Sequence, residues 1–225
     1  MLALLVDTAT AAVTVGVAEI ITPSDVTVRA RHVVVDARRH GEALAPGITA
    51  ALADAGVTAG QLSAIVAGVG PGPFTGLRVG LVTASAMSDA LGIPAYPVCS
   101  LDGLVTPGRP TLVATDARRR EVYWATYDAT GARVHGPDVA KPADLRVRLD
   151  TGELGEGLLA VGNGAALYAD QLGLPVGEPL YPDVAVLARI TAARILSGAP
   201  AEPLTPLYLR RPDAVEPGAA KSVLR

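Results

Sequence analysis

The sequence predicts an α/β protein of two lobes, of which the second is small and degenerate. Strand and helix patterns alternate through the first half of the 225 residues, and a Gly/Pro-rich stretch at 101–110 then separates them from a second series of strand patterns. A chain of this length is long for one domain and short for two, which favours two small lobes that share one interface. We expect an N-terminal lobe at 1–105, a smaller C-terminal lobe at 106–212 and a flexible tail at 213–225.

Three strands are expected at the start of the chain. Residues 2–6 and 12–18 are apolar or β-branched, and the short polar residues Asp7, Thr8 and Thr10 between them are typical of a turn. Residues 25–35 alternate apolar with polar residues before they become wholly apolar, as expected of a third strand. The chain therefore opens with a hairpin that a third strand extends.

A helical pattern follows at 38–55, where apolar residues recur at the spacing of one helix face. Pro46 lies inside this pattern, so we expect it either to kink the helix or to mark where the regular helix begins. Gly56 is the expected end of the helix, because glycine readily takes the left-handed conformation that closes many helices.

The next elements complete the first lobe. The unbroken apolar run at 64–69 predicts a strand covered on both faces, and a second helix is expected from about Gly76 to Leu91, closed by Gly92. A short strand is expected at 95–98. The order β-β-β-α-β-α-β resembles one lobe of the actin, Hsp70 and sugar-kinase fold, which is the actin-like (ASKHA, ribonuclease-H-like) fold.

The second lobe is predicted from four strand patterns and one helix. The strands are expected at 111–115, 121–127, 133–135 and 158–161. A helix within 181–197 places four apolar residues on one face, namely Val186, Ile190, Ala193 and Leu196. The Pro- and Gly-rich segment after Gly198 is expected to lie along the surface and to become flexible beyond Pro212.

The composition excludes several classes of function. The formal net charge of −3 provides no general field for gathering a phosphate backbone, so any contact with RNA is expected to be indirect, through a partner. Cys99 is the only cysteine, which excludes an internal disulfide and fits a reducing compartment. Because no apolar run approaches the roughly 20 residues that span a bilayer, we expect a soluble, cytoplasmic protein without a membrane segment.

A glycine-rich loop at 70–76 stands between a buried strand and a helix, which is the setting of many anion-binding loops. Two of its residues, Pro71 and Pro73, have no N–H to donate, which favours a stiff turn, and the other interpretation is a ligand loop.

The first hairpin turn is a second candidate, because actin-like proteins hold a nucleotide phosphate and its metal there. The candidates for such contacts are weak and are Asp7, Thr8, Thr10, Gly72 and Thr75. The three histidines are scattered, so no metal site is expected.

Small residues recur every four positions along the second helix, at Gly76, Gly80, Ala84 and Ser88. An interior glycine lowers helix propensity by about 1 kcal/mol relative to alanine, so another element is expected to approach this stripe closely. The stripe either packs inside its own lobe or forms a helix contact between subunits.

Arg78 lies in the first turn of this helix, where a cation is disfavoured. It therefore needs either a carboxylate such as Asp7 or Asp116, or a contact to a ligand or partner.

Residues Arg118, Arg119 and Arg120 form the only basic run. Most such runs are solvated turns, and the other interpretation is a local contact to RNA or phosphate. One short cluster cannot supply the six to ten phosphate contacts typical of independent nucleic-acid binding.

Five segments together resemble the TsaB (YeaZ) family, in an order and spacing that cover nearly the whole chain. They are LLVDTAT at 4–10, HGEALAP at 40–46, GPGPFTGLR at 70–78, DAR at 116–118 with EVY at 121–123, and PLYLR at 206–210. One departure is Pro73, where the family usually has serine. It removes a hydroxyl and an N–H from the loop, so we expect no cofactor to be bound tightly by the isolated chain.

The resemblance implies a non-catalytic dimerisation subunit of the machinery that makes threonylcarbamoyladenosine in tRNA. It implies a degenerate relative of TsaD, the subunit that transfers the threonylcarbamoyl group to the adenosine next to the anticodon. TsaD would bind through helices of the N-terminal lobe, TsaE, ATP and Mg would act on the complex, and the chain alone would form a homodimer. The expected interface residues are His40, Leu44, Ile48, Leu52, Gly76, Leu77, Gly80, Ala84 and Ser88. The alternative is a small actin-fold ATPase or metabolite kinase.

Overall fold

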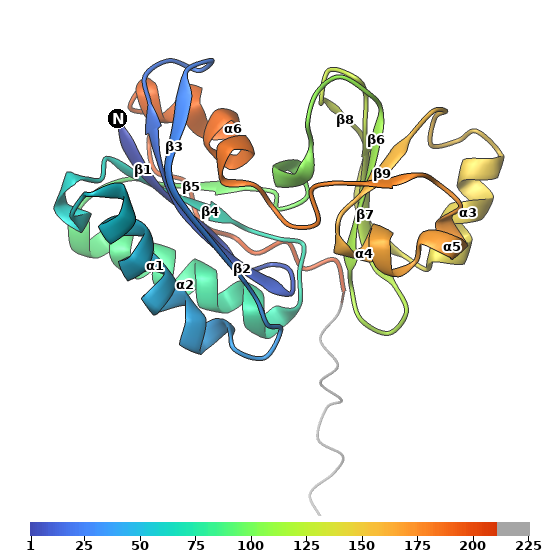
Figure 1. Cartoon of the computed structure of the whole chain (residues 1–225), viewed down its shortest axis with the longest axis horizontal. Helices are drawn as coiled ribbons and strands as arrows, with labels where there is room; N and C mark the ends of the chain where they lie inside the picture. Colours follow the sequence, from blue (N-terminus) through green and yellow to red (C-terminus); the bar gives the residue numbers. More distant parts are fainter. Residues whose placement is uncertain (211–225) are drawn as a thin grey trace, which may run out of the picture.

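Two five-stranded sheets, one in each lobe, organise the chain (Figure 1). The computed structural model describes residues 1–210, so the flexible tail predicted at 213–225 lies outside the described residues. The first sheet ends with β5 and the second begins with β6, and the boundary predicted after residue 105 falls between them. The first lobe contains β1 (Leu2–Asp7), β2 (Ala12–Ile20), β3 (Val26–Val35), α1 (His40–Ala55), η1 (Ala59–Gln61), β4 (Ala64–Gly68), α2 (Phe74–Leu91) and β5 (Ala95–Val98).

The first sheet has the strand order β3-β2-β1-β4-β5. The antiparallel hairpin β1–β2 and the antiparallel strand β3 confirm the expected start of the chain, while β4 and β5 continue the sheet in parallel. Successive residues of β1 point to opposite faces, so Leu5 packs against α6 (Val184–Leu196) and Leu4 packs against α1. The sheet is thus covered on one face by α1 and α2 and on the other by α6 (Figure 1).

The two helices on the first face differ slightly from their expected limits. Helix α1 begins at His40 and contains Pro46, so this proline does not mark the start of the helix. Gly56 closes it, as expected, and has φ of 67° in the left-handed region. Helix α2 begins at Phe74, two residues before Gly76, and Gly92 closes it with φ of 64°.

Helix α6 belongs to the N-terminal lobe, although the sequence assigned it to the C-terminal lobe. Its side chains pack on β1, β2, β4 and β5 of the first sheet. The face expected from Val186, Ile190, Ala193 and Leu196 is also wrong, because Ile190 and Ala193 are exposed. The buried face consists of Val184, Leu187, Ala188, Thr191, Ala192 and Ile195.

The second sheet has the strand order β10-β9-β6-β7-β8. Its elements are η2 (Asp102–Leu104) in the connection, β6 (Thr111–Asp116), β7 (Val122–Tyr127), β8 (Arg133–Ala140), α3 (Pro142–Asp150), β9 (Leu159–Val161), α4 (Asn163–Leu167), α5 (Ala169–Leu172) and β10 (Val176–Gly177). Three short helices cover one face of this sheet, and the residues after Cys99 pack on the other. Strand β8 continues five residues beyond the expected end at 135.

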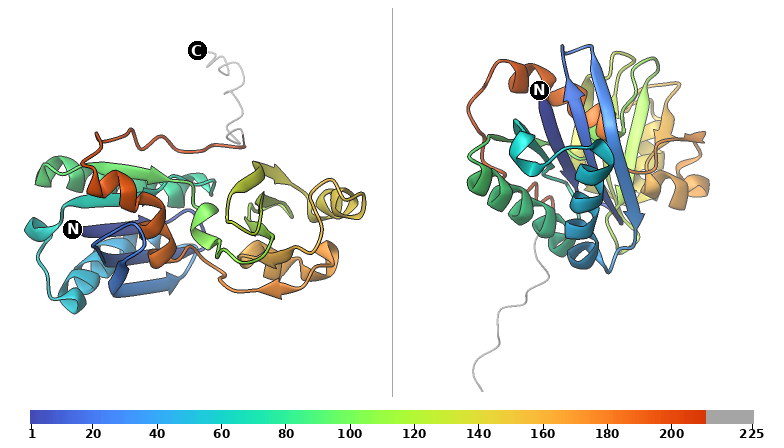
Figure 2. Two further views of the ribbon diagram at one scale, coloured as in Figure 1. Left: turned by 90° about the horizontal axis from the view of Figure 1, so that it is seen from above. Right: turned by 60° about the vertical axis from the view of Figure 1, so that its left-hand side comes forward.

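The chain then returns along the first lobe as a segment without helix or strand, residues 199–210, which we call the strap. The N–H of Glu202 donates to Ala95 O at 3.1 Å, and the N–H of Leu207 donates to Val69 O at 2.8 Å. At its end the guanidinium of Arg210 donates to Ala117 O in the second lobe at 2.9 Å. Figure 2 shows the strap passing beside the first lobe toward the second. It therefore contacts both lobes.

Candidate functional site

The first hairpin turn carries a buried carboxylate. Asp7 ends β1, and its Oδ1 accepts a hydrogen bond from the Ala9 N–H at 2.9 Å. Burial raises the pKa of Asp7 from its ordinary value of 3.8 to about 6, while Ser100, the Ala9 amide and His40 act in the opposite direction. Within the described residues Oδ2 has no hydrogen-bond partner. The carboxylate is therefore enclosed by its own lobe and is only 1% exposed.

The neighbouring Thr8 explains the small residues of α2. Its Oγ1 donates to the Gly76 carbonyl at 2.8 Å and accepts from the Gly80 N–H at 3.0 Å, two groups that normally bond to each other within a helix. A Cβ on Gly80 would lie 2.3 Å from Thr8 Oγ1. The Gly76–Gly80 stripe therefore packs inside its own lobe, against the hairpin turn, and this decides between the two interpretations of the stripe.

Most of the remaining residues of the expected interface are also buried in the same lobe, so their burial does not favour a docking role. His40, Leu44, Ile48, Leu77 and Ala84 are buried, and Leu52 and Ser88 are half-buried. The His40 ring places Nε2 2.8 Å from Thr10 O, so it ties α1 to the hairpin turn. Helical spacing identifies the buried face of a helix as readily as a docking face, and here it identified the core.

The weak ligand candidates divide into two groups. Asp7, Thr8, Thr10 and Gly72 come together at the hairpin turn, and all four are buried. Thr10 Oγ1 accepts from the Ala12 N–H at 3.1 Å, and a Cβ on Gly72 would lie 2.2 Å from Ala9 O. Thr75, in contrast, is exposed to solvent on α2. The first group thus holds the turn and the glycine loop together.

The outer face of α2 is open, and the sequence interpretation did not single it out. Phe74, Thr75, Arg78 and Val82 line a shallow groove on it, and the Val82 side chain projects away from the core. Helices α1 and α2 lie side by side and both have an outer face (Figure 1). The signal was available, because Val82 lies out of phase with the buried positions Leu77, Leu81 and Ala84.

Arg78 has a partner other than the expected Asp7 or Asp116. Its Nε donates to the Tyr208 hydroxyl at 2.9 Å, and its guanidinium carbon lies 3.9 Å from the centre of the Phe74 ring. The Phe74 and Tyr208 rings are stacked with their centres 5.2 Å apart. A cation over an aromatic ring is attracted by the negative face of the ring, so this cluster fastens the strap to α2.

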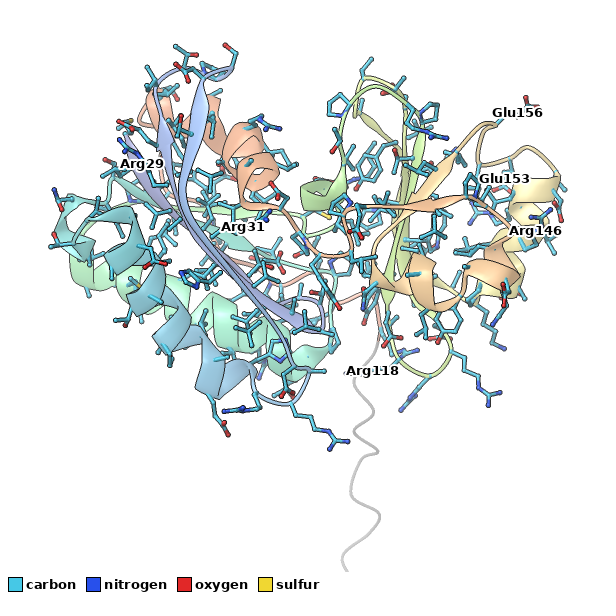
Figure 3. All side chains as sticks on the ribbon, viewed as in Figure 1. Arg29, Arg31, Arg118, Arg146, Glu153 and Glu156 are labelled. Atoms are coloured by element: carbon cyan, nitrogen blue, oxygen red, sulfur yellow. The ribbon has the colours of Figure 1, made fainter. Side chains whose placement is uncertain are left out.

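A hollow lies where the glycine loop, the β6–β7 turn and the strap meet. It has a volume of about 280 Å³ and is lined by Gly72, Pro73, Phe74, Ala117, Arg118, Arg119, Tyr123, Tyr208, Leu209 and Arg210. Arg118 projects from the turn at the inner end of the second lobe (Figure 3). The sequence identified the basic run but could not place it beside the strap.

The turn that carries the basic run has an unusual backbone. Arg118, Arg119 and Arg120 have φ of 62°, 53° and 62°, the left-handed region that costs a side-chain-bearing residue roughly 1–2 kcal/mol. The turn is held by hydrogen bonds from the Ala117 N–H to Glu121 O at 2.9 Å and from the Arg118 N–H to Asp116 Oδ1 at 3.0 Å. Strain of this kind concentrates at functional sites and persists where surrounding contacts fix the conformation.

Three further findings bear on the chemistry. Within residues 1–210, no three His, Cys, Asp or Glu side chains are grouped so that they could hold a metal ion. Burial raises the pKa of the Cys99 thiol to about 12, so Cys99 stays protonated at neutral pH and is a poor nucleophile. No helix in the described part of the chain has the length and apolar character needed to cross a membrane.

The chain resembles known proteins over nearly its whole length. Residues 33–204 match the model of the family TsaD, tRNA N6-adenosine threonylcarbamoyltransferase. An uncharacterised Mycobacterium tuberculosis protein is 51% identical over 213 residues, which cover 94% of this chain and 92% of the relative. The Escherichia coli tRNA threonylcarbamoyladenosine biosynthesis protein TsaB is 30% identical over 224 residues, which cover 92% of this chain and 94% of the relative.

A solved structure agrees with the sequence matches. It is a Pseudomonas aeruginosa protein described as similar to the peptidase YeaZ, with a TM-score of 0.74 and 26% identity, and the match covers 93% of this chain and 99% of that one. The two α/β lobes and this neighbour confirm the predicted actin-like fold. With a family model that spans most of the chain and a full-length TsaB relative, the chain belongs to the TsaB (YeaZ) family.

Proposed function

We propose that this protein is a non-catalytic subunit that binds TsaD and supports threonylcarbamoyl transfer to the tRNA adenosine next to the anticodon. The observation that carries the proposal is the full-length match to E. coli TsaB, in a chain whose candidate ligand residues Asp7, Thr8, Thr10 and Gly72 are buried. Asp7 is buried and Gly72 is packed against Ala9, so the hairpin turn that would serve an actin-fold ATPase is occupied by the protein itself. TsaE and ATP would act on the assembly.

The surface proposed for TsaD is the outer face of α1 and α2, in place of the buried stripe. Its exposed residues are mostly small or uncharged and include Ala45, Thr49, Val82, Ser85 and Ala86. Low side-chain bulk lets the backbone of another helix come close, and Val82 supplies an apolar contact that is costly to leave in water. In the absence of TsaD, the same face would pair two copies of the chain.

A glutamate at Val82 tests this surface. The Val82 side chain is 67% exposed, so Val82→Glu leaves the fold intact but places a charge in the proposed contact, where its desolvation is unfavourable. The matched control is Val147→Glu on α3, where the valine is 63% exposed on the second lobe. We expect Val82→Glu to lower co-purification with TsaD by at least tenfold and Val147→Glu to leave it unchanged.

These variants distinguish an error in the proposed contact surface from an error in the proposed function. If both variants retain TsaD at the wild-type ratio, the outer face of α2 is not the contact surface. If the wild-type chain retains no TsaD, the proposed function itself fails. Unfolding midpoints in urea, measured for all three proteins, show that any loss of binding does not arise from loss of folding.

A further inference from the structure

Positive charge is concentrated around the hollow between the lobes. The three segments that form it, 70–78, 116–123 and 206–210, contain five arginines, two acidic residues and no lysine. This is a local excess of three positive charges in a chain whose formal net charge is −3. The rest of the molecule is therefore acidic, and an anion approaching it is attracted to this region in particular.

The two acidic residues are already engaged. Arg210 forms an ion pair with Glu121 and donates to Ala117 O, so it holds the strap to the turn. Asp116 is mostly buried, and its Oδ2 lies 3.6 Å from Arg118 Nη1. A contact of that length is weaker than a direct hydrogen bond, and the Arg118 side chain remains 56% exposed. Its guanidinium can reach an anion in the hollow without first breaking a short ion pair.

The backbone of the turn aims these side chains. Three consecutive left-handed residues bend β6 back into β7 and place Arg118 and Arg119 on the wall of the hollow, opposite the glycine loop and the strap. Arginine presents a planar fork of N–H donors that matches the oxygens of a phosphate. The exposed rings of Phe74 and Tyr208 also line the hollow, and base or sugar groups attached to a phosphate can pack on such rings.

We propose that this hollow binds backbone phosphates of an RNA that the assembly holds, with Arg118 and Arg119 as the phosphate ligands. The proposal rests on the proposed function for the presence of RNA. Few cations take part, so the contact is weak alone and adds to the binding by the partner through high effective concentration. It revises the expectation that contact with tRNA is only indirect. The proposal favours RNA over a free phosphate compound because the arginines project from an exposed turn, which an extended polyanion can reach.

The test compares two double variants that remove equal charge. Arg118→Gln with Arg119→Gln removes two charges at the hollow. The control, Arg29→Gln with Arg31→Gln, removes two charges on β3, where the side chains are 49% and 58% exposed and are also ion-paired. The labels in Figure 3 show that the control residues lie on the other lobe, away from Arg118. Binding of a fluorescein-labelled tRNA transcript is measured by anisotropy across a salt series, with the full chain alone and with its TsaD complex.

We expect the hollow variant to weaken tRNA binding at least tenfold at low salt. It should also reduce the slope of log affinity against log salt by about one to two, because each lost phosphate contact lowers that slope by nearly one. The control should change affinity less than twofold. Equal losses of tRNA affinity in the two variants would overturn the proposal, because a general effect of charge would then explain them. No loss of affinity in either variant would also overturn it, because the arginines would then not contact the RNA.

Two further measurements keep the outcomes apart. Co-purification with TsaD is expected to be unchanged in both double variants. If the wild-type chain fails to bind TsaD, the proposed function is refuted. In that case the tRNA titration of the chain alone still tests the phosphate site. Calorimetry with inorganic pyrophosphate tests a free phosphate compound. Pyrophosphate binding that depends on Arg118 and Arg119, without any effect of the variant on tRNA, would overturn the assignment to RNA.

Discussion

One hydroxyl group joins the first hairpin to α2. Thr8 Oγ1 stands between the Gly76 carbonyl and the Gly80 N–H, so a side chain from another element completes two hydrogen bonds of the helix. Glycine at these positions lowers helix propensity, and the close approach of the turn offsets that loss. The stripe therefore fixes the glycine loop and the hairpin relative to each other, which shapes one side of the hollow between the lobes.

A methyl group at Gly80 tests this arrangement. Gly80→Ala would place Cβ 2.3 Å from Thr8 Oγ1, so the hydroxyl must move and lose its hydrogen bonds. We expect the free energy of unfolding to fall by about 1–3 kcal/mol. The matched control is Gly47→Ala in α1, where the nearest atom is 3.5 Å away, and there alanine should raise the free energy of unfolding by up to about 1 kcal/mol. Urea denaturation measures both, and a shift of the same sign in the two variants would contradict the role of Thr8.

The sequence identified the right residues here but not what they contact. Gly76 and Gly80 stood out because glycine inside a helix lowers helix propensity and so indicates that another element approaches closely. Packing within the lobe and contact with another subunit would both explain such an approach. The partner of Arg78 was missed because Tyr208 is 130 residues away in the sequence. Local spacing determines which side chains share a helix face, whereas the atoms that meet this face depend on contacts that are distant in the chain.

At the scale of elements, α6 closes the second face of the first sheet. The Asp183 side chain accepts from the Ala185 N–H at 2.8 Å and so caps the start of the helix, and the buried face then packs on Leu5 and its neighbours in the sheet. Without this helix, apolar side chains of four strands would face water. The C-terminal part of the chain is therefore required for the core of the N-terminal lobe.

Two truncations on α6 distinguish its true face from the one that the sequence favoured. Leu187 is fully buried against the sheet, so Leu187→Ala should lower the free energy of unfolding by about 2–5 kcal/mol through lost burial and a cavity. Ile190 is exposed on the same helix, so Ile190→Ala should change it by less than about 1 kcal/mol. Thermal and urea unfolding give both values. Equal losses would mean that α6 packs differently from the arrangement described here.

The first two helices and every strand except the two-residue β10 could be predicted because their patterns are strong. Alternation marks β3, an unbroken apolar run marks β4, and glycine ends α1 and α2 at the expected positions. The face of α6 was missed because half of it consists of Ala188, Thr191 and Ala192, which contribute little to an apolar pattern although they are buried. Large exposed residues such as Ile190 therefore dominated the pattern.

The whole molecule is held together by contacts between segments that are far apart in the sequence. The strap runs from β5 to the β6–β7 turn, and α6 lies against both the first sheet and η2 in the connection. Such contacts leave no local period, so the sequence could place neither α6 in its lobe nor the strap beside the basic run. The geometry of the hollow depends on these contacts, because its walls come from both lobes.

Asp102 of η2 makes one of the contacts that fix the second sheet on the connection. Its Oδ1 accepts from the Tyr127 hydroxyl at 2.7 Å, and the Arg133 guanidinium donates to both carboxylate oxygens. Burial raises the pKa of Tyr127, so this hydroxyl stays a donor at neutral pH. A bidentate pair of this kind, largely withdrawn from water, resists rotation of one lobe against the other.

Removing the carboxylate should therefore loosen the junction between the lobes. Asp102→Ala leaves the Arg133 charge and the Tyr127 hydroxyl without this acceptor, and we expect the free energy of unfolding to fall by about 2–3 kcal/mol. The control is Glu153→Ala, which breaks the more exposed pair with Arg148 inside the second lobe and should cost less than about 1 kcal/mol. If the junction couples the lobes, the urea m-value should also fall in Asp102→Ala alone, because the lobes then unfold in separate steps. An unchanged m-value with a loss no larger than that of the control would show that the strap and α6 are sufficient to couple them.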